Sequence, residues 1–365
     1  MSSCESNVVR NTILNRLEVD AGWSFQESQD FELFTTSDTY EKVVILLERL
    51  KDHHNVVVVH DNDPDGFCSA AILRKCLEKT ECKNVNYIAV THGKPFSEFS
   101  FKEALIDADV AFILDHGCSF ALQEHLAEVC PGEVVIIDHH PETDGNGPCT
   151  VIASTRWSTT MLTSGLADNY LDMGINFSSV PCVVNHYDSW RFGKDSNYDD
   201  LVKSFMAAVF HLGANQTKWD TFFCSEEGPD LMVSYILKGL EIREYQRVTI
   251  DRLIKKAMVR LTMPSTDQGK EWVFGVIFHS DLIDTLANEA LESDPSLDFV
   301  LIVYSKGGPH PYKLSFRSSN ERVDVSAIAR SLGGGGHRNA SGVNADHVTL
   351  TNFLSSTKVF NHGQL

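Results

Sequence analysis

An alternation of short apolar runs and helical segments is the feature of this chain that most limits its fold. From Tyr40 to about residue 140, runs such as NVVVVH, VNYIAV, DVAFILDHG and EVVIIDHH alternate with helix-like segments such as FCSAAILRKCLEK and SFALQEHLAEV. Strands that are buried on both faces read as continuous apolar runs, and strand–helix alternation implies a parallel sheet covered by helices. The sequence therefore predicts a parallel α/β domain at residues 39–228.

Three further segments complete the predicted organisation. Residues 1–38 are polar with a few aromatic residues and are interpreted as an N-terminal extension on the surface. Residues 229–264 are interpreted as a helical linker, because Leu231 to Met263 contain no turn signal except Gly239. Residues 265–365 contain strand-like runs such as EWVFGVIF, FVLIVYSKGG and PYKLSFRSS, separated by helical segments. They predict a second, smaller α/β domain.

Charge and composition limit the partners. The net charge is −19 and no basic run is present, whereas proteins that grip long duplex DNA or RNA present a basic face. No apolar run approaches the about 20 residues that span a bilayer, so neither long duplex nucleic acid nor a membrane is expected. The first residues lack a signal-peptide pattern, and the 9 cysteines form no CxxC pair. We therefore expect a cytoplasmic protein with mostly buried, reduced thiols.

Aspartates follow the apolar runs where these runs end. In chain order, the residues are Asp61, Asp63 and Asp65 after VVVVH, Asp115 after VAFIL, Asp138, His139 and His140 after VVII, and Asp188 after CVVNHY. A single Asp after a strand is common, because Asp favours turns and helix caps. Four successive cases are not explained by capping alone. Since parallel strands end at one edge of their sheet, where ligands bind, we expect these side chains to lie together.

Carboxylates and imidazoles in one place predict a metal site. The oxygen-rich set favours Mn²⁺ or Mg²⁺, with Co²⁺ or Zn²⁺ as alternatives. The number of acids exceeds the need of one ion, which indicates two ions, the usual arrangement for hydrolysing phosphate esters. Bound cations would also offset the negative charge that an anionic substrate meets.

Two other motifs share part of this pattern. DNDPDG matches the opening of a calcium EF-hand loop, but the twelfth position is Ile72 where the loop needs Glu, and a strand precedes it. DPDG also resembles the nucleophile signature of haloacid-dehalogenase phosphatases. In that family the first Asp ends the strand directly, whereas here His60, Asp61 and Asn62 intervene, and IIDHH has no role in that mechanism.

The segments DNDPDG, ILDHG, IIDHH and HYDSWRF resemble motifs one to four of the DHH phosphoesterases. SFRSS followed by VSAIARSLGGGGHRNASG resembles the DHH-associated C-terminal domain with its GGGH signature. The resemblance covers roughly residues 40–345, in the right order. It implies a DHH domain, a helical linker and a smaller α/β domain, with the active site in the cleft between the domains.

The resemblance also implies a role for each motif residue. Asp61 and Asp63 would bind one metal ion, Asp65, His139 and Asp188 the other, and Asp115 would bridge them. The catalytic set would be Asp115, His139 and His140, with Asp138 orienting the histidine pair. In the C-terminal domain, substrate phosphate would be bound by Arg317, Gly334, Gly335, Gly336 and His337.

Some positions depart from the family pattern or remain open. Asp61 stands where many members have His, although RecJ-type exonucleases also have Asp. His60, His116 and His186 lie beside the motif acids, where a structural or orienting role is favoured over direct ligation.

Taken together, the resemblance implies a metal-dependent phosphoric ester hydrolase with two Mn²⁺ ions, for which Mg²⁺ or Co²⁺ could substitute. Its expected substrates are short oligonucleotides or small nucleotides: a dinucleotide, a cyclic dinucleotide or 3′-phosphoadenosine 5′-phosphate, cleaved to mononucleotides. The alternatives are an exopolyphosphatase or pyrophosphatase, a RecJ-like single-strand exonuclease, and a nucleotide-binding protein without activity. A homodimer is expected by analogy with the family alone.

Overall fold

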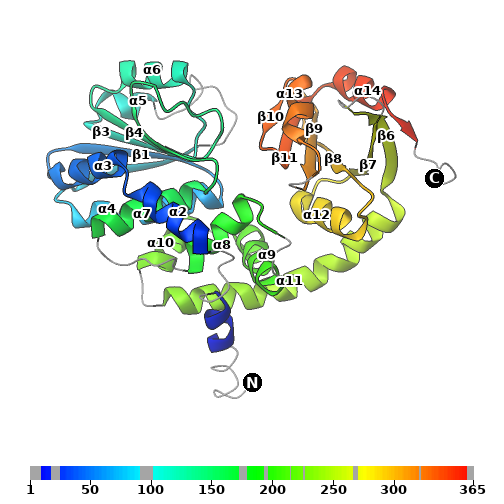
Figure 1. Ribbon diagram of the computed structural model, residues 1–365, viewed down its shortest axis with the longest axis horizontal. Coiled ribbons are helices and arrows are strands. Elements are labelled where there is room, and N and C mark those ends of the chain that lie inside the picture. The colour runs from blue at the N-terminus through cyan, green and yellow to red at the C-terminus, as the bar shows by residue number, and fades with distance from the viewer. Residues whose placement is uncertain are drawn as a thin grey trace. The chain divides into compact units, whose positions relative to one another are not determined.

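The computed structural model describes residues 10–17, 25–90, 102–171, 179–192, 196–213, 215–224, 227–265, 270–319 and 322–359. The chain divides into two compact units, Met1–Arg243 and Glu244–Leu365. Both units combine a β-sheet with helices, which confirms the predicted α/β class (Figure 1). The expected position of the active site in a cleft between the two domains stays a prediction.

The first unit holds a five-stranded sheet and most of the helices. Its elements, in chain order, are α2 (Phe25–Thr35), α3 (Asp38–Arg49), β1 (Asn55–Asp61), α4 (Pro64–Lys79), β2 (Asn84–Val90), α5 (Lys102–Ile106), β3 (Val110–Leu114), α6 (Phe120–Val129), β4 (Glu133–Asp138), β5 (Thr150–Ala153), α7 (Thr159–Leu171), α8 (Ser179–Asp188), α9 (Ser196–Leu212), α10 (Gln216–Cys224) and the start of α11 (Gly228–Lys256).

All neighbouring strands of this sheet run parallel, in the order β2-β1-β3-β4-β5. The chain moves from β1 outward to β2 and then returns to β3 on the other side of β1. Strand order therefore reverses between β1 and β3, and in open α/β sheets ligands bind outside the carboxyl ends of strands at such a point. The edge strand β5 has no counterpart among the predicted strands, because its four residues are too few to show a pattern.

The two faces of this sheet carry separate cores. Val56 and Val58 pack with α4 and α7 on one face, whereas Val57 and Val59 pack with α5 and α6 on the other. Figure 1 shows α5 and α6 on one side of the sheet and α4 and α7 on the opposite side. Successive strand residues point to opposite faces, so an uninterrupted valine run is what a doubly covered strand requires.

The segment interpreted as a surface extension contributes to the core of the first unit. Phe31 of α2 is 5% exposed, and its ring lies 5.0 Å from the ring of Trp157. Phe34 contacts the same indole at 5.2 Å, and Ile13 and Leu17 are buried in the same core. Sparse aromatic residues in a polar segment give no helical period, so the sequence did not show this packing.

The second unit is built on a seven-stranded mixed sheet. Its elements are the end of α11, β6 (Val259–Pro264), β7 (Glu271–Phe278), α12 (Ile283–Ser293), β8 (Phe299–Ser305), β9 (Tyr312–Ser318), α13 (Val325–Ser331), β10 (Gly335–Gly336), β11 (Ala340–Ala345), α14 (His347–Ser355) and β12 (Lys358–Val359). The strand order is β10-β11-β9-β8-β7-β6-β12, and β7 and β8 form its parallel pair. Helices α13 and α14 pack on one face and α12 on the other.

The end of the predicted helical linker differs from the structure. Helix α11 ends at Lys256, and β6 pairs antiparallel with β7 over Val259–Pro264. Side chains alternate between the two faces of this strand, and Leu261 joins the core of the second unit. The weak helical pattern after Lys256 is thus overridden by pairing with a distant strand.

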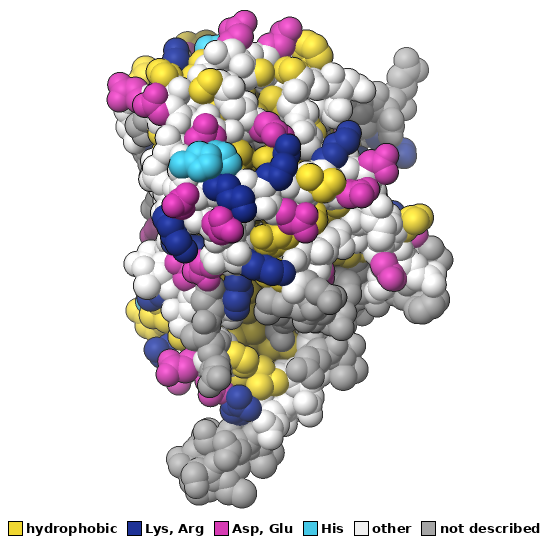
Figure 2. Space-filling model, turned by 90° about the vertical axis from the view of Figure 1, so that its left-hand side faces the viewer, with side chains coloured by type: hydrophobic (Ala, Val, Ile, Leu, Met, Phe, Trp, Pro, Cys, Tyr) yellow, Lys and Arg dark blue, Asp and Glu magenta, His cyan; other side chains and the backbone are white. Residues whose placement is uncertain are grey.

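Charged side chains of both signs are interspersed on the face of the molecule that Figure 2 shows. The residues coloured there form no continuous basic surface, in line with the net charge of −19. Within the described ranges, no helix has the length and apolar character needed to cross a membrane.

Candidate metal centre

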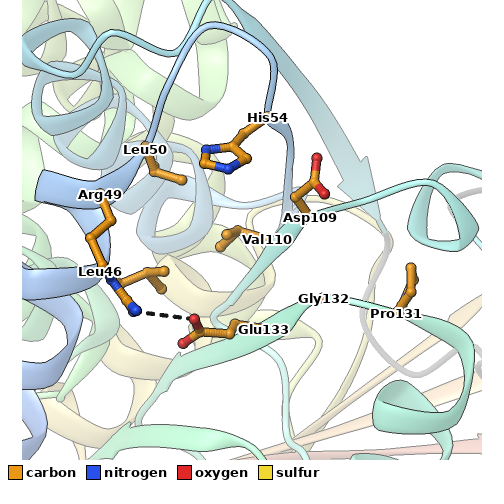
Figure 3. A pocket seen from close by; sticks show the side chains of 9 residues that line it. All are labelled: Leu46, Arg49, Leu50, His54, Asp109, Val110, Pro131, Gly132 and Glu133. Carbon is orange, nitrogen blue, oxygen red and sulfur yellow. Dashed lines mark hydrogen bonds and ion pairs between the residues drawn. The ribbon is translucent and has the colours of Figure 1, made fainter.

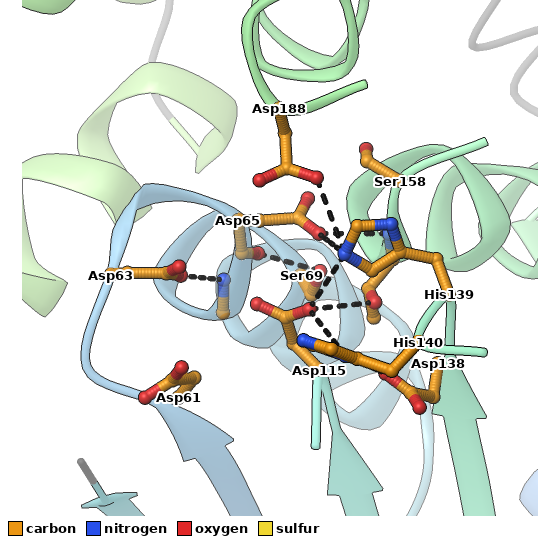
Figure 4. Close-up of polar contacts among 12 residues, drawn as sticks. Asp61, Asp63, Asp65, Ser69, Asp115, Asp138, His139, His140, Ser158 and Asp188 are labelled. Carbon is orange, nitrogen blue, oxygen red and sulfur yellow. Dashed lines mark hydrogen bonds and ion pairs between the residues drawn. The ribbon is translucent and has the colours of Figure 1, made fainter. Parts of the chain in front are cut away.

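The predicted site residues of the first unit meet at the carboxyl ends of β1, β3 and β4. Asp61 is the last residue of β1, Asp115 directly follows β3, and Asp138 ends β4. The cluster lies where the strand order reverses, between β1 and β3. The side chains of Asp65, Asp115 and Asp188 point toward His139, as Figure 4 shows.

The start of α4 positions Asp63 and Asp65. Asp63 caps this helix, because its Oδ1 accepts a hydrogen bond of 2.9 Å from the Gly66 amide, and Pro64 follows at the first helical position. A Cβ at Gly66 would lie 2.3 Å from the carbonyl oxygen of Asp61. The turn from β1 into α4 is therefore so tight that only glycine fits at this position.

Asp65 is held by a second helix. Its Oδ2 accepts a hydrogen bond from the Thr159 amide and its Oδ1 one from the Thr160 amide, both at 2.9 Å. These amides begin α7, whose N-terminal end favours a negative charge. The orientation of Asp65 is thus fixed by the fold. Sequence analysis did not identify these two threonines, because their backbone amides make the contact and no side-chain type signals it.

Asp188 reaches the cluster from a helix and not from a strand. The run CVVNHYD was treated as one of the strand-like runs that end in an acid, but residues Ser179–Asp188 form α8. Val183 and Val184 are both buried in the core. A short apolar run satisfies a buried strand and a buried helix equally, and periodicity cannot separate the two. The expected proximity of Asp188 to the other acids is nevertheless observed.

His139 occupies the middle of the cluster. Its Nε2 lies 3.2 Å from Asp188 Oδ2, 3.4 Å from Asp115 Oδ1 and 3.8 Å from Asp65 Oδ2. Among the described residues of the first unit, three groups each have one ligand atom per residue within 4.8 Å of the others: Asp61, Asp63 and Asp115; Asp65, His139 and Asp188; and Asp115, Asp138 and His140. The first two groups follow the predicted division between two ions. Their role as ligands stays a prediction.

Asp138 lies beneath the cluster and holds His140. Its Oδ1 is 2.8 Å from His140 Nδ1, and its Oδ2 accepts a hydrogen bond from the Thr143 hydroxyl. Burial opposes ionisation of both partners, but the hydrogen bond raises the pKa of His140 to about 9. The same contact, with that of Thr143, lowers the pKa of Asp138 despite its burial. His140 is therefore positively charged at neutral pH in the metal-free protein.

The other acids repel one another when no cation lies between them. Burial, together with the charges of Asp61 and Asp65, raises the pKa of Asp63 to about 6. Burial and the neighbouring carboxylates also raise the pKa of Asp115 and of Asp188 well above the ordinary value. A cation between the carboxylates would remove this penalty.

Two further observations fit a metal ion. Asp188 Oδ2 is out of contact with solvent, and within the described part of the chain it accepts no hydrogen bond. Asp115 has a φ of 58°, in the left-handed region that most side chains avoid. A strained acid and an unsatisfied buried oxygen beside a central imidazole are features of a binding site. The oxygen-rich ligands suit Mn²⁺ or Mg²⁺.

The histidines beside the motif acids have structural contacts. His186 Nε2 lies 2.7 Å from Asp199 Oδ1. His60 Nδ1 lies 2.8 Å from the Asp61 carbonyl oxygen, and its ring faces Phe67. These contacts support the favoured structural role for His60 and His186.

The residues predicted to bind substrate phosphate lie in the second unit. Arg317 donates from Nε to Asp284 Oδ1 at 2.7 Å, a partner that the sequence did not indicate. Gly334 contacts β11 so closely that a Cβ would lie 2.2 Å from the Gly342 carbonyl oxygen, and Gly336 has a φ of 129°. His337 follows these glycines in the turn to β11, where its amide donates to the Ala340 carbonyl. Gly335 pairs with Gly342. The phosphate-binding role of this set stays a prediction.

A cavity of about 530 Å³ lies at the opposite edge of the first sheet, at the amino ends of β1, β3 and β4 (Figure 3). Arg49 and Glu133 form an ion pair of 3.2 Å across it, and His54 and Asp109 also line it. It brings together none of the predicted site residues.

Two family models match the chain. The model of the DHH family, N-terminal domain, matches residues 55–181, and the model of the DHHA1 domain matches residues 270–358. The matched ranges together make up more than half of the chain. The first contains the acids and histidines from Asp61 to His140 but ends before Asp188, and the second contains Arg317 and the glycines with His337.

The sequence identity between this chain and individual matching proteins is low. The uncharacterized protein R106 of Acanthamoeba polyphaga mimivirus is 26% identical over 311 residues, which cover 80% of this chain and 68% of R106. The crystal structure of RecJ in complex with Mn²⁺ from Thermus thermophilus matches with a TM-score of 0.56 and 15% identity, over 88% of this chain and 54% of RecJ. This chain therefore spans about half the length of that RecJ.

The crystal structure of CDC45 from Entamoeba histolytica matches with a TM-score of 0.53 and 10% identity, over 87% of this chain and 97% of CDC45. At such identities these structures share the fold with this chain, and nothing about activity follows from them. The order of the two matched domains agrees with the order of the motifs and with the two units of the structure. The chain belongs to the DHH family, with a DHH N-terminal domain followed by a DHHA1 domain.

Proposed function

We propose that this protein is a metal-dependent phosphodiesterase that hydrolyses short oligonucleotides or small nucleotides to mononucleotides. The observation that carries the proposal is the buried set of acids around His139 at the carboxyl edge of the first sheet. Members of the DHH family are phosphoesterases, so the class of reaction agrees with the family.

Divalent ions are proposed as the cofactors, with Mn²⁺ preferred and Mg²⁺ or Co²⁺ as substitutes. RecJ of Thermus thermophilus, which shares the fold, was solved in complex with Mn²⁺. Asp61 and Asp63 would hold one ion, Asp65, His139 and Asp188 the second, and Asp115 would contact both. A bound pair of ions would activate water and neutralise the phosphoryl oxygens.

His140 is proposed to stabilise the substrate phosphate. Its Nδ1 is engaged with Asp138, and this contact raises the pKa of the ring in the metal-free protein. A protonated ring held in this way would have a second N–H, at Nε2, that can donate to a phosphoryl oxygen as negative charge develops. Asp138 orients this ring and takes no direct part.

The DHHA1 domain is proposed to bind the substrate. Arg317 offers a planar group with several donors, and Gly334, Gly335 and Gly336 would let the backbone approach an anion closely. His337 would add an imidazole beside them. This assignment depends on the family match over residues 270–358 and on the residue types.

Small substrates are favoured over long ones. The chain is strongly acidic, with a net charge of −19, whereas proteins that track long strands use basic grooves. A dinucleotide, a cyclic dinucleotide and 3′-phosphoadenosine 5′-phosphate are the proposed substrate types. A RecJ-like exonuclease and an exopolyphosphatase are the alternative enzymes. A nucleotide-binding protein without activity is less favoured, because the acids and histidines of the motifs are all present.

Product analysis distinguishes these functions. Purified protein with Mn²⁺ would be offered a 5′-labelled dinucleotide, a 20-mer of the same label, a cyclic dinucleotide, 3′-phosphoadenosine 5′-phosphate and a short polyphosphate, each with an EDTA control. We expect mononucleotide release from one or more of the small nucleotides and slow turnover of the 20-mer. Equal rates on the dinucleotide and the 20-mer would favour the exonuclease, phosphate from polyphosphate alone the exopolyphosphatase, and no product the binding protein.

A further inference from the structure

The residue two positions after Asp188 has an unusual backbone. Trp190 has a φ of 54° where α8 ends. The Trp190 amide donates to the Tyr187 carbonyl at 3.2 Å, and the Arg191 amide donates to the His186 carbonyl at 3.0 Å. This pair of bonds around a left-handed residue is the Schellman ending of a helix, in which glycine normally occupies the position of Trp190. A tryptophan here has a backbone cost that glycine would avoid.

The indole of Trp190 belongs to an aromatic platform, which we define as Tyr187, Trp190, Phe192 and Phe210. Ring centroids lie 5.3 Å apart for Trp190 and Phe192, 6.1 Å for Tyr187 and Trp190, and 5.8 Å for Tyr187 and Phe210. Tyr187 and Phe192 pack against the core of the first unit, whereas Phe210 is 56% exposed. Trp190 is half-buried, so the platform is packed against the core at Tyr187 and Phe192 and open to solvent at Phe210.

The platform adjoins the metal centre through the chain itself. Asp188 lies between Tyr187 and Trp190 in the sequence, and its Oδ2 is 3.2 Å from His139 Nε2. Two trans peptide units limit the distance between the Cα atoms of Asp188 and Trp190 to about 7.6 Å. The backbone that carries the Trp190 ring therefore starts within about the length of one nucleoside from Asp188, a predicted metal ligand.

A cation lies beside the rings. Lys203 Nζ is 5.3 Å from the centroid of the Phe192 ring. Lys203 and Phe210 are both on α9, seven residues apart, and so share one face of that helix. Aromatic surfaces next to a positive charge are the combination that binds single-stranded nucleotides, whose bases stack while their phosphates need a counter-charge.

We propose that the aromatic platform stacks a nucleobase of the substrate, with Trp190 as the main contact. The inference rests on the proposed function and narrows it to phosphoesters that carry a base, which disfavours polyphosphate and pyrophosphate. Stacking tolerates every base, so selectivity for one base is not expected. The strained backbone at Trp190 is then explained by a requirement for the ring and not for the turn.

The test compares two probes that differ only in the base. Dissociation constants of adenosine 5′-monophosphate and of ribose 5-phosphate would be measured by calorimetry on the full chain with Mn²⁺. Trp190→Gly removes the ring but suits the left-handed backbone, and thermal unfolding would verify that the variant is folded at the temperature of the binding experiment. Trp190→Phe keeps a ring, and Tyr245→Ala removes an aromatic side chain that is 85% exposed on α11.

We expect the unmodified protein to bind adenosine 5′-monophosphate about ten-fold more tightly than ribose 5-phosphate. Trp190→Gly should abolish that preference without changing the dissociation constant of ribose 5-phosphate. Trp190→Phe should keep most of the preference, and Tyr245→Ala should keep all of it. A preference that survives in Trp190→Gly overturns the inference. The inference is also overturned if the unmodified protein binds both compounds equally well. It is overturned as well if Trp190→Gly weakens the binding of both compounds by the same factor, which would make Trp190 a positioning residue for Asp188.

The two proposals can fail separately. If no phosphoester is hydrolysed but the preference depends on Trp190, the proposed catalysis fails and base stacking stands. If a dinucleotide is hydrolysed but the preference is independent of Trp190, base stacking fails and the phosphodiesterase stands.

Discussion

His140 Nδ1 lies 2.8 Å from Oδ1 of Asp138, whose side chain is completely buried beneath the acidic cluster. This contact places a positive ring among carboxylates that repel each other. It also raises the pKa of His140 to about 9, although burial acts against the charged ring. The pair therefore places one positively charged ring beside the acids at neutral pH when no metal ion is bound.

Asp138→Asn should return the pKa of His140 toward its ordinary value, because the asparagine cannot supply the negative charge. Nuclear magnetic resonance titration of the metal-free protein would measure it. Hydrolysis should fall by about 10–100-fold, the usual cost of losing a group that orients a metal-site residue. An unchanged pKa in the variant would contradict the assigned role of Asp138.

The same pair predicts a pH dependence of stability. A group whose pKa is raised in the folded state contributes stability that is complete below its unfolded pKa, about 6.5 for His, and is lost as pH rises through its folded pKa. The His140 contribution in the metal-free protein should therefore be lost between about pH 6.5 and the folded value of about 9. Denaturant unfolding across this range should show the loss in the unmodified protein and not in Asp138→Asn.

Asp115→Asn should remove nearly all hydrolysis and leave the fold intact. Asparagine tolerates the left-handed backbone at this position, and removal of one charge relieves repulsion in the metal-free state. Asp115→Ala should be equally inactive but about 1 kcal/mol less stable than Asp115→Asn, because alanine does not tolerate that backbone. Rates and thermal unfolding would be compared for both, and near-normal turnover in Asp115→Asn would exclude a central role for this acid.

Mn²⁺ should stabilise the protein. At a concentration of about 100 times the dissociation constant, binding adds about 2.7 kcal/mol to the free energy of unfolding, or roughly 5 °C or more in melting temperature. EDTA should reverse the shift, and the double variant Asp63→Asn/Asp115→Asn should lack it. The control Asp251→Asn, an exposed acid on α11, should retain it. A shift of the same size in the double variant would place the bound Mn²⁺ elsewhere.

Gly66→Ala should reduce stability and hydrolysis together. The new methyl group would lie 2.3 Å from the Asp61 carbonyl oxygen, so the turn that carries Asp61, Asp63 and Asp65 must shift. Overpacking of this kind costs about 1–3 kcal/mol. Gly145→Ala is the matched control, because its Cβ meets no atom within 4 Å. Full activity in Gly66→Ala would mean that this turn adjusts without moving the acids.

Arg317→Ala should mainly raise KM, by about ten-fold or more, because charged hydrogen bonds to phosphate are formed on binding. Steady-state kinetics on the best small nucleotide would separate KM from kcat. Arg330→Ala removes a side chain that is 54% exposed on α13 and should change neither. A loss confined to kcat would assign Arg317 to the chemical step instead.

The sequence predicted the parts of the fold that repeat a local pattern. The apolar runs that became β1, β3 and β4 are long and buried on both faces, so Asp61, Asp115 and Asp138 could be placed at one edge. The order of the strands was not needed to place these acids together, because the carboxyl ends of all parallel strands lie at the same edge of the sheet. The expected cluster of acids therefore depended on strand direction alone.

The parts that sequence analysis missed depend on distant partners. Phe31 became a core residue through Trp157, and β11 exists because it pairs with β9. Asp188 was expected near the acids for a reason that the helix α8 contradicts, since a short apolar run fits either structure. The Thr159 and Thr160 amides that hold Asp65 leave no trace in residue type.

Asp63 and Asp65 each accept backbone amides at the start of a helix as well as lie at the metal centre: Asp63 caps α4, and Asp65 accepts the first amides of α7. Their carboxylates consequently serve folding even when hydrolysis has no value to the cell. A descendant that lost its activity would remain under selection to keep both, whereas Asp61 and Asp188, which cap no helix N-terminus among the described elements, would be free to drift. Among distant relatives, the residues at positions 61 and 188 should therefore indicate retained catalysis better than the residues at positions 63 and 65.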